Sequence, residues 1–235
     1  MKTEPHILFE DQEILVCEKP AGVPVESARI GTADMVSILR NYLAAKPEVS
    51  GIPYVGLVHR LDQPVQGVMV FAKTKKSAAN LSAQVSGGRM KKIYQAVVEG
   101  NPPEESGQLT DWLFKNGKTN TSEIVKEGTK GAKKAMLNYR VLERRDGRAL
   151  VEVELLTGRH HQIRVQMAGA GMPLAGDRKY GKADNLPEQK MPDKAGDGMP
   201  SVLEHVALCA VRLTFCHPKT GKELTFTCKP DFSIQ

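Results

Sequence analysis

The sequence lacks any long apolar run. No segment approaches the ~20 consecutive apolar residues that a membrane-spanning helix needs, so helical membrane proteins are excluded. The N-terminal segment MKTEPHILFEDQE carries acidic residues and has no apolar signal-peptide core, which argues against export. We therefore expect a cytoplasmic protein.

Cysteine is scarce, and its spacing fits no metal site. None of the four cysteines forms a C-x-x-C pair, and most lie in alternating strand patterns, which favours reduced core or strand-face thiols. The adjacent His160-His161 pair also lacks ligand spacing, because neighbours on a helix point about 100° apart. We expect no metal. The cysteines are Cys17, Cys209, Cys216 and Cys228.

Length and composition are those of a globular chain. With 235 residues, 40% of them apolar, the chain can bury a sizeable core as one domain or two closely packed lobes. The 33 basic and 27 acidic residues give a net charge of +6, which modestly favours a polyanionic partner. The basic residues gather in three runs: Lys73, Lys75 and Lys76; Arg89, Lys91 and Lys92; and Lys126, Lys130, Lys133 and Lys134.

Strand and helix patterns mix without a βαβ rhythm or an internal repeat, which predicts the α+β class. An Asp146-Gly147 pair joins two long strand patterns and is a strong hairpin signal. Expected strands cover 7–19 around a turn at 10–13, two runs within 54–73, 89–99, a hairpin within 107–134, 135–144, 148–156, 206–215 and 222–229. Expected helices cover 32–45 with Thr32 as N-cap, 75–86 and 157–170.

The most informative stretch is 54–73, YVGLVHRLDQPVQGVMVFAK. Two apolar runs flank the polar segment His59-Arg60-Leu61-Asp62, and Pro64 and Gly67 are turn residues, so we expect a loop held between two strands. Loops on a rigid scaffold often carry chemistry. Taken alone, this stretch favours a surface ion pair beside a hairpin.

Four further segments change that interpretation. They are Lys19-Pro20-Ala21-Gly22, 92–100 (KIYQAVVEG), 156–164 (LTGRHHQIR) and 176–181 (GDRKYG). Together with the His59–Asp62 segment, and in this order, they make the chain resemble the RluA-type family of RNA pseudouridine synthases from Ile7 to about Phe232. The resemblance implies a mixed, largely antiparallel sheet with flanking helices and a central basic cleft. It also implies a single catalytic domain over 1–235, without the S4 RNA-binding domain of many relatives, and we expect a mobile loop at 182–200.

The reaction that the resemblance implies needs few catalytic groups. Making pseudouridine breaks the bond between uracil N1 and ribose C1′, turns the base and rejoins it through C5. No redox step or energy input is involved, so no cofactor is expected. One carboxylate acting as nucleophile or base suffices in principle, and the family's single Asp corresponds to Asp62.

The resemblance assigns further roles. Arg164 would pair with Asp62 and keep it ionised near the RNA phosphates. Arg60 would fill the gap that an extruded uridine leaves, and Tyr94 would stack on the extruded base and handle a proton. We expect the remaining substrate-binding residues to be His59, Leu61, Arg159, His160 and Gln162.

Two departures from the family pattern concern substrate choice more than chemistry. Val65-Gln66 replaces a usual Thr-Ser pair, and Cys209 replaces a usual His. A non-catalytic RNA-binding protein that retains the fold is therefore an alternative. A hydrolase of glycosidic bonds is a second, although it would need two flanking carboxylates. The expected partner is a stem-loop of rRNA or tRNA with an exposed uridine, bound by a monomer.

Overall fold

The computed structural model describes residues 4–28, 31–181 and 204–234. Within it the chain divides into two compact units. The first unit comprises Met1–Ile93 and Cys209–Pro230, and the second comprises Tyr94–Leu208 and Asp231–Gln235. The single domain expected over 1–235 stays a prediction, and the expected loop at 182–200 lies outside the described residues.

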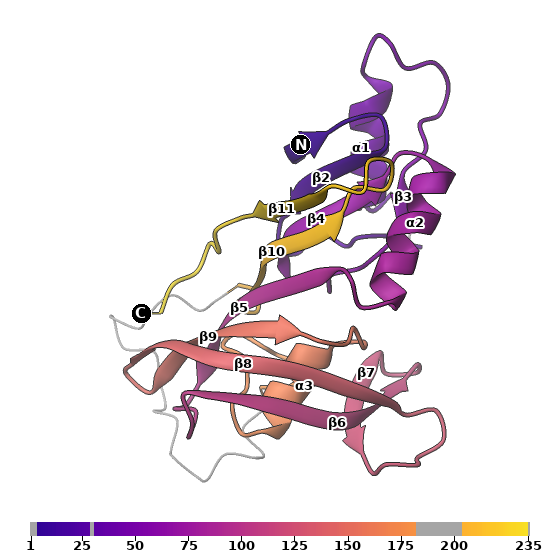
Figure 1. Ribbon diagram of the computed structural model, residues 1–235. Coiled ribbons are helices and arrows are strands. Elements are labelled where there is room, and N and C mark those ends of the chain that lie inside the picture. The colour runs from indigo at the N-terminus through magenta and orange to yellow at the C-terminus, as the bar shows by residue number, and fades with distance from the viewer. Residues whose placement is uncertain (1–3, 29–30, 182–203, 235) are drawn as a thin grey trace. The chain divides into compact units, whose positions relative to one another are not determined.

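The first unit is built on a sheet with the strand order β1-β2-β4-β10 (Figure 1). All its pairs of known register are antiparallel except β4 with β10, which is parallel. Two more strands extend it, because β11 pairs with β10 and β3 with β4. The strands are β1 (His6–Glu10), β2 (Ile14–Lys19), β3 (Gly56–Leu57), β4 (Gln66–Ala72), β10 (Leu208–Cys216) and β11 (Glu223–Thr227).

Strand β4 is the most buried element of this sheet. Its residues from Gly67 to Ala72 are buried on both faces, as expected for a strand with neighbours on either side. Val68 and Val70 share a core cluster with Leu81 of helix α2 (Lys75–Ser86), whose bounds agree with the predicted helix. The two strand runs predicted within 54–73 are thus confirmed as β3 and β4.

Helix α1 (Met35–Ala44) begins later than predicted. Thr32 is not its N-cap; that position belongs to Asp34, whose carboxylate accepts a hydrogen bond from the Ser37 amide at 2.7 Å. The Ser37 hydroxyl lies 3.0 Å from the Asp34 amide and completes a capping box. An Asp that can bond reciprocally with the third residue of the helix outcompetes the earlier Thr.

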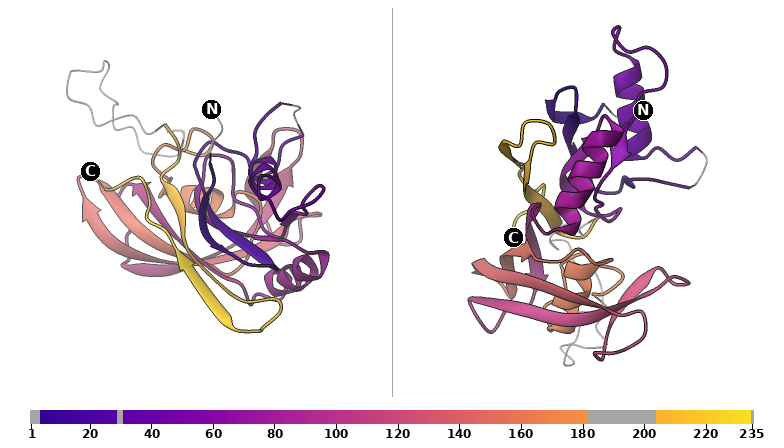
Figure 2. Two further views of the ribbon diagram at one scale, coloured as in Figure 1. Left: turned by 90° about the horizontal axis from the view of Figure 1, so that it is seen from above. Right: turned by 45° about the vertical axis from the view of Figure 1, so that its right-hand side comes forward.

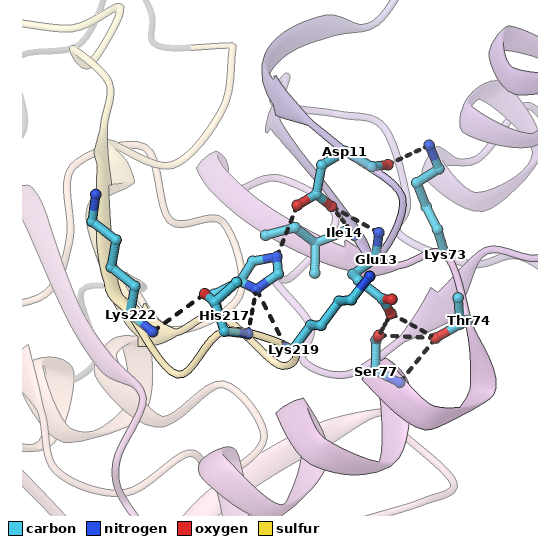
Figure 3. A network of polar contacts seen from close by, with 10 residues as sticks. Asp11, Glu13, Ile14, Lys73, Thr74, Ser77, His217, Lys219 and Lys222 are labelled. Atoms are coloured by element: carbon cyan, nitrogen blue, oxygen red, sulfur yellow. Dashed lines mark hydrogen bonds and ion pairs between the residues drawn. The ribbon is translucent and has the colours of Figure 1, made fainter.

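Polar contacts join two turns and the start of helix α2 in the first unit (Figure 3). His217, after β10, lies 2.8 Å from the Asp11 carboxylate between β1 and β2. Glu13 accepts hydrogen bonds from Ser77 and Thr74 at the start of α2, where a carboxylate also complements the helix dipole. These contacts tie the β1–β2 turn, the β10–β11 turn and α2 together.

The second unit holds an antiparallel sheet in the order β9-β8-β6-β7 (Figure 2). Strand β5 (Lys91–Glu99) enters it from the first unit, since the division falls after Ile93. The hairpin predicted at Asp146-Gly147 is confirmed, with φ of 49° and 78° that suit Asp and Gly. The strands are β6 (Ser106–Asn116), β7 (Thr121–Val125), β8 (Lys133–Arg145) and β9 (Arg148–Leu155).

Helix α3 (Gln162–Gly169) packs on β6 and β7. Its predicted start at Thr157 is wrong, because His161 adopts a left-handed backbone with φ 53° immediately before the helix. His160 therefore does not share a helix face with Arg164. Ile163 and Met167 of this helix are buried.

The α+β class and the largely antiparallel sheets are confirmed. The described residues contain three α-helices together with the eleven strands. In the described ranges no helix is both long and apolar enough to span a bilayer.

Candidate functional site

Asp62 lies in the loop between β3 and β4 of the first unit. Its carbonyl accepts a hydrogen bond from the Val65 amide at 3.0 Å, which closes a turn. Leu61 and Val65 are buried on either side of it, with 7% and 2% of their surface exposed. Asp62 itself is half-buried. The loop thus anchors two apolar side chains and leaves Asp62, between them in the sequence, only partly buried.

His59 fixes the start of this loop. Its Nε2 accepts a hydrogen bond from the Val70 amide of β4 at 3.2 Å. Burial, helped by the positive charge of Lys92, lowers the pKa of His59 to about 3, so the ring is neutral at physiological pH. With Nε2 accepting, Nδ1 carries the proton. That buried nitrogen has no hydrogen-bond partner within the described residues.

Lys19 fixes the other end of the loop. This lysine is 1% exposed, and its ammonium donates hydrogen bonds to the carbonyls of Pro20 at 2.9 Å and Gln63 at 3.0 Å. Gln63 and Gly22 also bond to each other twice, through the Gly22 amide at 2.9 Å and the Gln63 side chain at 3.0 Å. The Lys19–Gly22 segment is therefore a brace for the residue that follows Asp62.

The charge of Lys19 bears on Asp62. Burial lowers the pKa of Lys19 to about 7, and the negative charge of Asp62 opposes that fall. The two side chains thus interact electrostatically inside one unit. Lys19 is charged below about pH 7, across the range in which carboxylates titrate.

Gly67 is required where the loop enters β4. Its φ is 132°, and a Cβ there would lie 2.5 Å from the backbone nitrogen of Ala210 on β10. Only glycine allows that approach. The glycine retained in the Val65-Gln66-Gly67 segment therefore has a packing reason, and the buried Val65 packs where the family usually has a hydroxyl.

Arg60 of the first unit and Tyr94 of the second, the two residues expected to act on the extruded uridine, differ in exposure. Arg60 is exposed, and its guanidinium lies 3.8 Å from the Glu26 carboxylate, with both side chains more than half in solvent. Such an ion pair contributes little, so Arg60 is easily redirected. Tyr94 is 5% exposed and lies on β5.

Arg164 lies on α3 in the second unit and is held by Asp177. Its Nε and Nη2 each donate a hydrogen bond of 2.7 Å to one Asp177 oxygen, and both side chains are buried. Burial raises the pKa of Asp177, but Arg164 and the amides of Lys179 and Tyr180 more than offset this, so the pKa falls below its ordinary value. The two-point contact fixes the plane of the guanidinium.

A second set of polar contacts surrounds this pair. The Tyr180 ring lies 5.1 Å from the Arg164 guanidinium carbon, and its hydroxyl lies 2.7 Å from His161 Nδ1. Burial, followed by the charge of Arg164, lowers the pKa of His161 to about 3. His160 stacks on His161, with ring centres 3.7 Å apart, and contacts the Ser122 hydroxyl at 2.9 Å. This packing supports the left-handed backbone at His161.

Gln162 organises the turn before α3. Its side-chain oxygen accepts from the Thr157 hydroxyl at 2.8 Å and the Arg159 amide at 2.9 Å, while its nitrogen donates to the Met136 carbonyl at 3.0 Å. Gln162 is 3% exposed, whereas Arg159 is exposed and donates to the Lys134 carbonyl. The substrate-binding roles of both stay predictions.

The predicted residues thus form two constellations, one in each unit. His59 to Asp62 gather with Lys19, and Arg159 to Arg164 gather with Asp177 and Tyr180. The pairing of Asp62 with Arg164 and the basic cleft stay predictions. No roles were predicted from the sequence for Lys19, Asp177 and Tyr180. A signal was present, because all three belong to the Lys19–Gly22 and 176–181 segments that carry the family resemblance.

Comparisons with known proteins agree on one family. The family model of RNA pseudouridylate synthase matches residues 13–169, which include Lys19, Asp62 and Arg164. The ribosomal large subunit pseudouridine synthase D of Neisseria meningitidis serogroup A is 36% identical over 220 residues, 94% of this chain and 56% of that protein. The protein of the same name from Zymomonas mobilis is 33% identical, over 94% of this chain and 67% of that protein. The chain thus spans little more than half of the Neisseria protein.

Solved structures show the same likeness. Human RNA pseudouridylate synthase domain containing 4 superposes with a TM-score of 0.75 and 25% identity, covering 96% of this chain and 88% of that one. Human RNA pseudouridylate synthase domain containing 1 has the same fold, with a TM-score of 0.75 and 21% identity. The chain therefore belongs to the RNA pseudouridylate synthase family.

Proposed function

We propose that this protein is an RNA pseudouridine synthase that isomerises a uridine of large-subunit ribosomal RNA, with Asp62 as its catalytic carboxylate. Family membership supports the reaction class, and the names of the relatives favour ribosomal RNA over tRNA. The observation that carries the proposal is the Asp62 loop. The half-buried Asp62 stands on a loop that is braced by hydrogen bonds of the buried Lys19 and His59.

Lys19 is a positioning residue in this proposal. Its ammonium holds the Gln63 carbonyl, one residue from Asp62, and its charge favours the ionised carboxylate. Preorganisation of this kind is effective because the loop need not reorder during the reaction.

Arg164 supplies a second cation, from the other unit. We propose that it pairs with Asp62 when RNA is bound, as the family resemblance implies. Asp177 supports this role by fixing the guanidinium at two points. A guanidinium has five N–H donors, so it can donate hydrogen bonds to a second carboxylate while it remains bound to the first.

Extrusion of the target uridine completes the proposal. Unstacking a base costs a few kcal/mol, and the exposed, weakly paired Arg60 is suited to fill the gap. Tyr94 would stack on the extruded base. Asp62 then assists cleavage of the bond between N1 and C1′. Rejoining through C5 releases the C5 hydrogen as a proton, and N1 takes up a proton, so the product is an isomer of uridine. The cytoplasmic location and the monomeric state remain predictions.

Tritium release tests the proposal directly. Large-subunit rRNA transcripts tritiated at uracil C5 are incubated with wild type, with Asp62→Asn, and with Asp146→Asn as control. Asp146 is an exposed turn residue with φ 49°, which Asn accommodates, so the control makes the same charge change away from the site. We expect release by wild type and Asp146→Asn but none by Asp62→Asn, whose RNA affinity changes less than about tenfold.

The same assay separates the alternatives. RNA binding by wild type without tritium release, on rRNA and tRNA transcripts alike, would favour a non-catalytic RNA-binding protein. Appearance of free uracil would favour hydrolysis. Full release by Asp62→Asn would reject Asp62 as the catalytic group.

A further inference from the structure

Two cysteines of the first unit lie side by side. Cys209, near the start of β10, and Cys228, just after β11, have their sulfur atoms 3.6 Å apart. The antiparallel pairing of β10 with β11 reaches Arg212 and Thr227, and the Cys228 amide continues it by donating to the Val211 carbonyl at 3.0 Å. Cys228 therefore lies opposite Val211, two residues from Cys209 on the same face. The hairpin itself holds the two thiols together.

The two thiols differ in exposure and acidity. Cys209 is fully buried, whereas Cys228 is half-buried and open to small molecules. A hydrogen bond from Cys209 lowers the pKa of Cys228, against the opposing effects of burial and Glu18, and the Val68 amide adds to the lowering. Cys17 shows the contrast, because burial raises its pKa to about 12. Reactive cysteines combine a stabilised thiolate with access.

We propose that Cys209 and Cys228 form a reversible disulfide when the protein meets hydrogen peroxide, with Cys228 as the attacking thiol and Cys209 as the resolving thiol. The Cys228 thiolate attacks one peroxide oxygen, and the O–O bond breaks. Cys228 becomes a sulfenic acid, and the hydroxide that leaves takes up the proton lost by the thiol and forms water. The Cys209 sulfur then attacks the sulfenic sulfur, the S–O bond breaks, and a second water leaves. Two thiols and one peroxide thus give one disulfide and two waters.

The geometry requires only a small movement. A disulfide bond is about 2.05 Å long, so the two sulfurs must approach each other from their present contact at 3.6 Å. The pair also lies close to the Asp62 loop in the sheet, since Cys209 is in register with Gln66, the first residue of β4. Neither Cys17 nor Cys216 has a thiol partner of this kind among the described contacts.

Mass spectrometry of the full chain tests the proposal. Reduced protein is treated with hydrogen peroxide at a stoichiometric dose, unfolded in iodoacetamide to block free thiols, and digested without reductant. We expect a Cys209–Cys228 cross-linked peptide and alkylated Cys17 and Cys216. A parallel sample, reduced with dithiothreitol before alkylation, should contain four free thiols. Absence of a disulfide, or one that links other cysteines, would overturn the proposal.

Single variants test the order of the two steps. Cys209→Ser should stop at the sulfenic acid, which dimedone traps on Cys228. Cys228→Ser should give no Cys209 disulfide and at least about tenfold less dimedone adduct on Cys209 than Cys209→Ser gives on Cys228, because Cys209 is buried. Cys216→Ser, on the same strand as Cys209, is the matched control and should form the disulfide as wild type does. Circular dichroism of the reduced variants checks folding. Trapping on Cys209 in place of Cys228 would reject the assigned order.

Discussion

Lys19 is the residue whose environment departs most from what its chemical type prefers. Lysine is almost never fully buried, yet this side chain is 1% exposed and binds two backbone carbonyls. Carbonyl oxygens solvate the ammonium only partly, so its pKa falls to about 7. Because burying the ammonium of Lys19 is energetically unfavourable, we expect its positive charge to have a role in the site. Asp62, the acidic group that acts on that pKa, is the candidate beneficiary.

Replacing Lys19 with Met should change the pH dependence of the reaction. Lys19 is charged below about pH 7 and favours ionised Asp62 there, so its loss should move the acid limb of the tritium-release profile upward by roughly one pH unit. The measurement is kcat/KM for tritium release between pH 5 and 9. Lys73→Met, which removes a cation paired with Glu10 at the other end of β4, is the control.

A purely structural role for Lys19 would give a different result. In that case Lys19→Met would lower activity by the same factor at every pH, and the acid limb would coincide with that of wild type. If Asp62→Asn also retained activity, the catalytic proposal itself would fail, and the two failures are therefore distinguishable.

Helix starts show how local competition decides an element's bounds. Thr32 and Asp34 are both good N-cap residues, but Asp34 alone has a serine three positions ahead that returns the bond. Its second oxygen also accepts from the Ser27 amide at 2.8 Å, which ties the preceding loop to the helix. Asp34 is buried, so no water would replace these bonds if the carboxylate were removed.

Substituting the two candidate caps tests this difference. Asp34→Ala should lower the free energy of unfolding by about 1–2 kcal/mol, because it leaves helix amides without acceptors. Thr32→Ala, at an exposed position outside the helix, should change it by less than about 0.5 kcal/mol. Urea denaturation followed by circular dichroism measures both. Equal effects would contradict the assignment of Asp34 as the cap.

At the scale of the whole molecule, charge sets the expected mode of RNA binding. The net charge is +6. The connection between β7 and β8 and the first two residues of β8 present four exposed lysines, Lys126, Lys130, Lys133 and Lys134. Exposed lysines bind phosphates with release of counterions, which makes affinity depend steeply on salt. Bases contribute far less to that dependence.

RNA affinity should therefore fall steeply with salt. Between about 50 and 200 mM salt we expect a linear decrease of log K with log salt, and Lys130→Gln with Lys133→Gln should reduce the slope by roughly one to two. Filter binding to an rRNA transcript measures the slope. Arg145→Gln, at the β8–β9 turn beside Asp146, serves as a control. A flat response in wild type would contradict phosphate-driven binding.

The sequence by itself determined the local elements and the residue types of the site. Helix α2, the Asp146-Gly147 hairpin and the strands around the Asp62 loop follow from periodicity and turn residues, which act over a few neighbours. The family resemblance, carried by short motifs, named Asp62, Tyr94 and Arg164. The same local information misplaced the starts of α1 and α3. The capping box between Asp34 and Ser37 fixes the start of α1, and the left-handed backbone of His161 fixes the start of α3.

Only the tertiary structure decided which distant groups meet. Lys19 reaches Gln63 from 44 positions away, Arg164 meets Asp177 from 13, and Cys209 meets Cys228 from 19. Such contacts depend on strand order and register, which close the intervening chain, and no single segment encodes them. Burial then sets the chemistry, because removal from water is the largest cause of the lowered pKa of both Lys19 and His161.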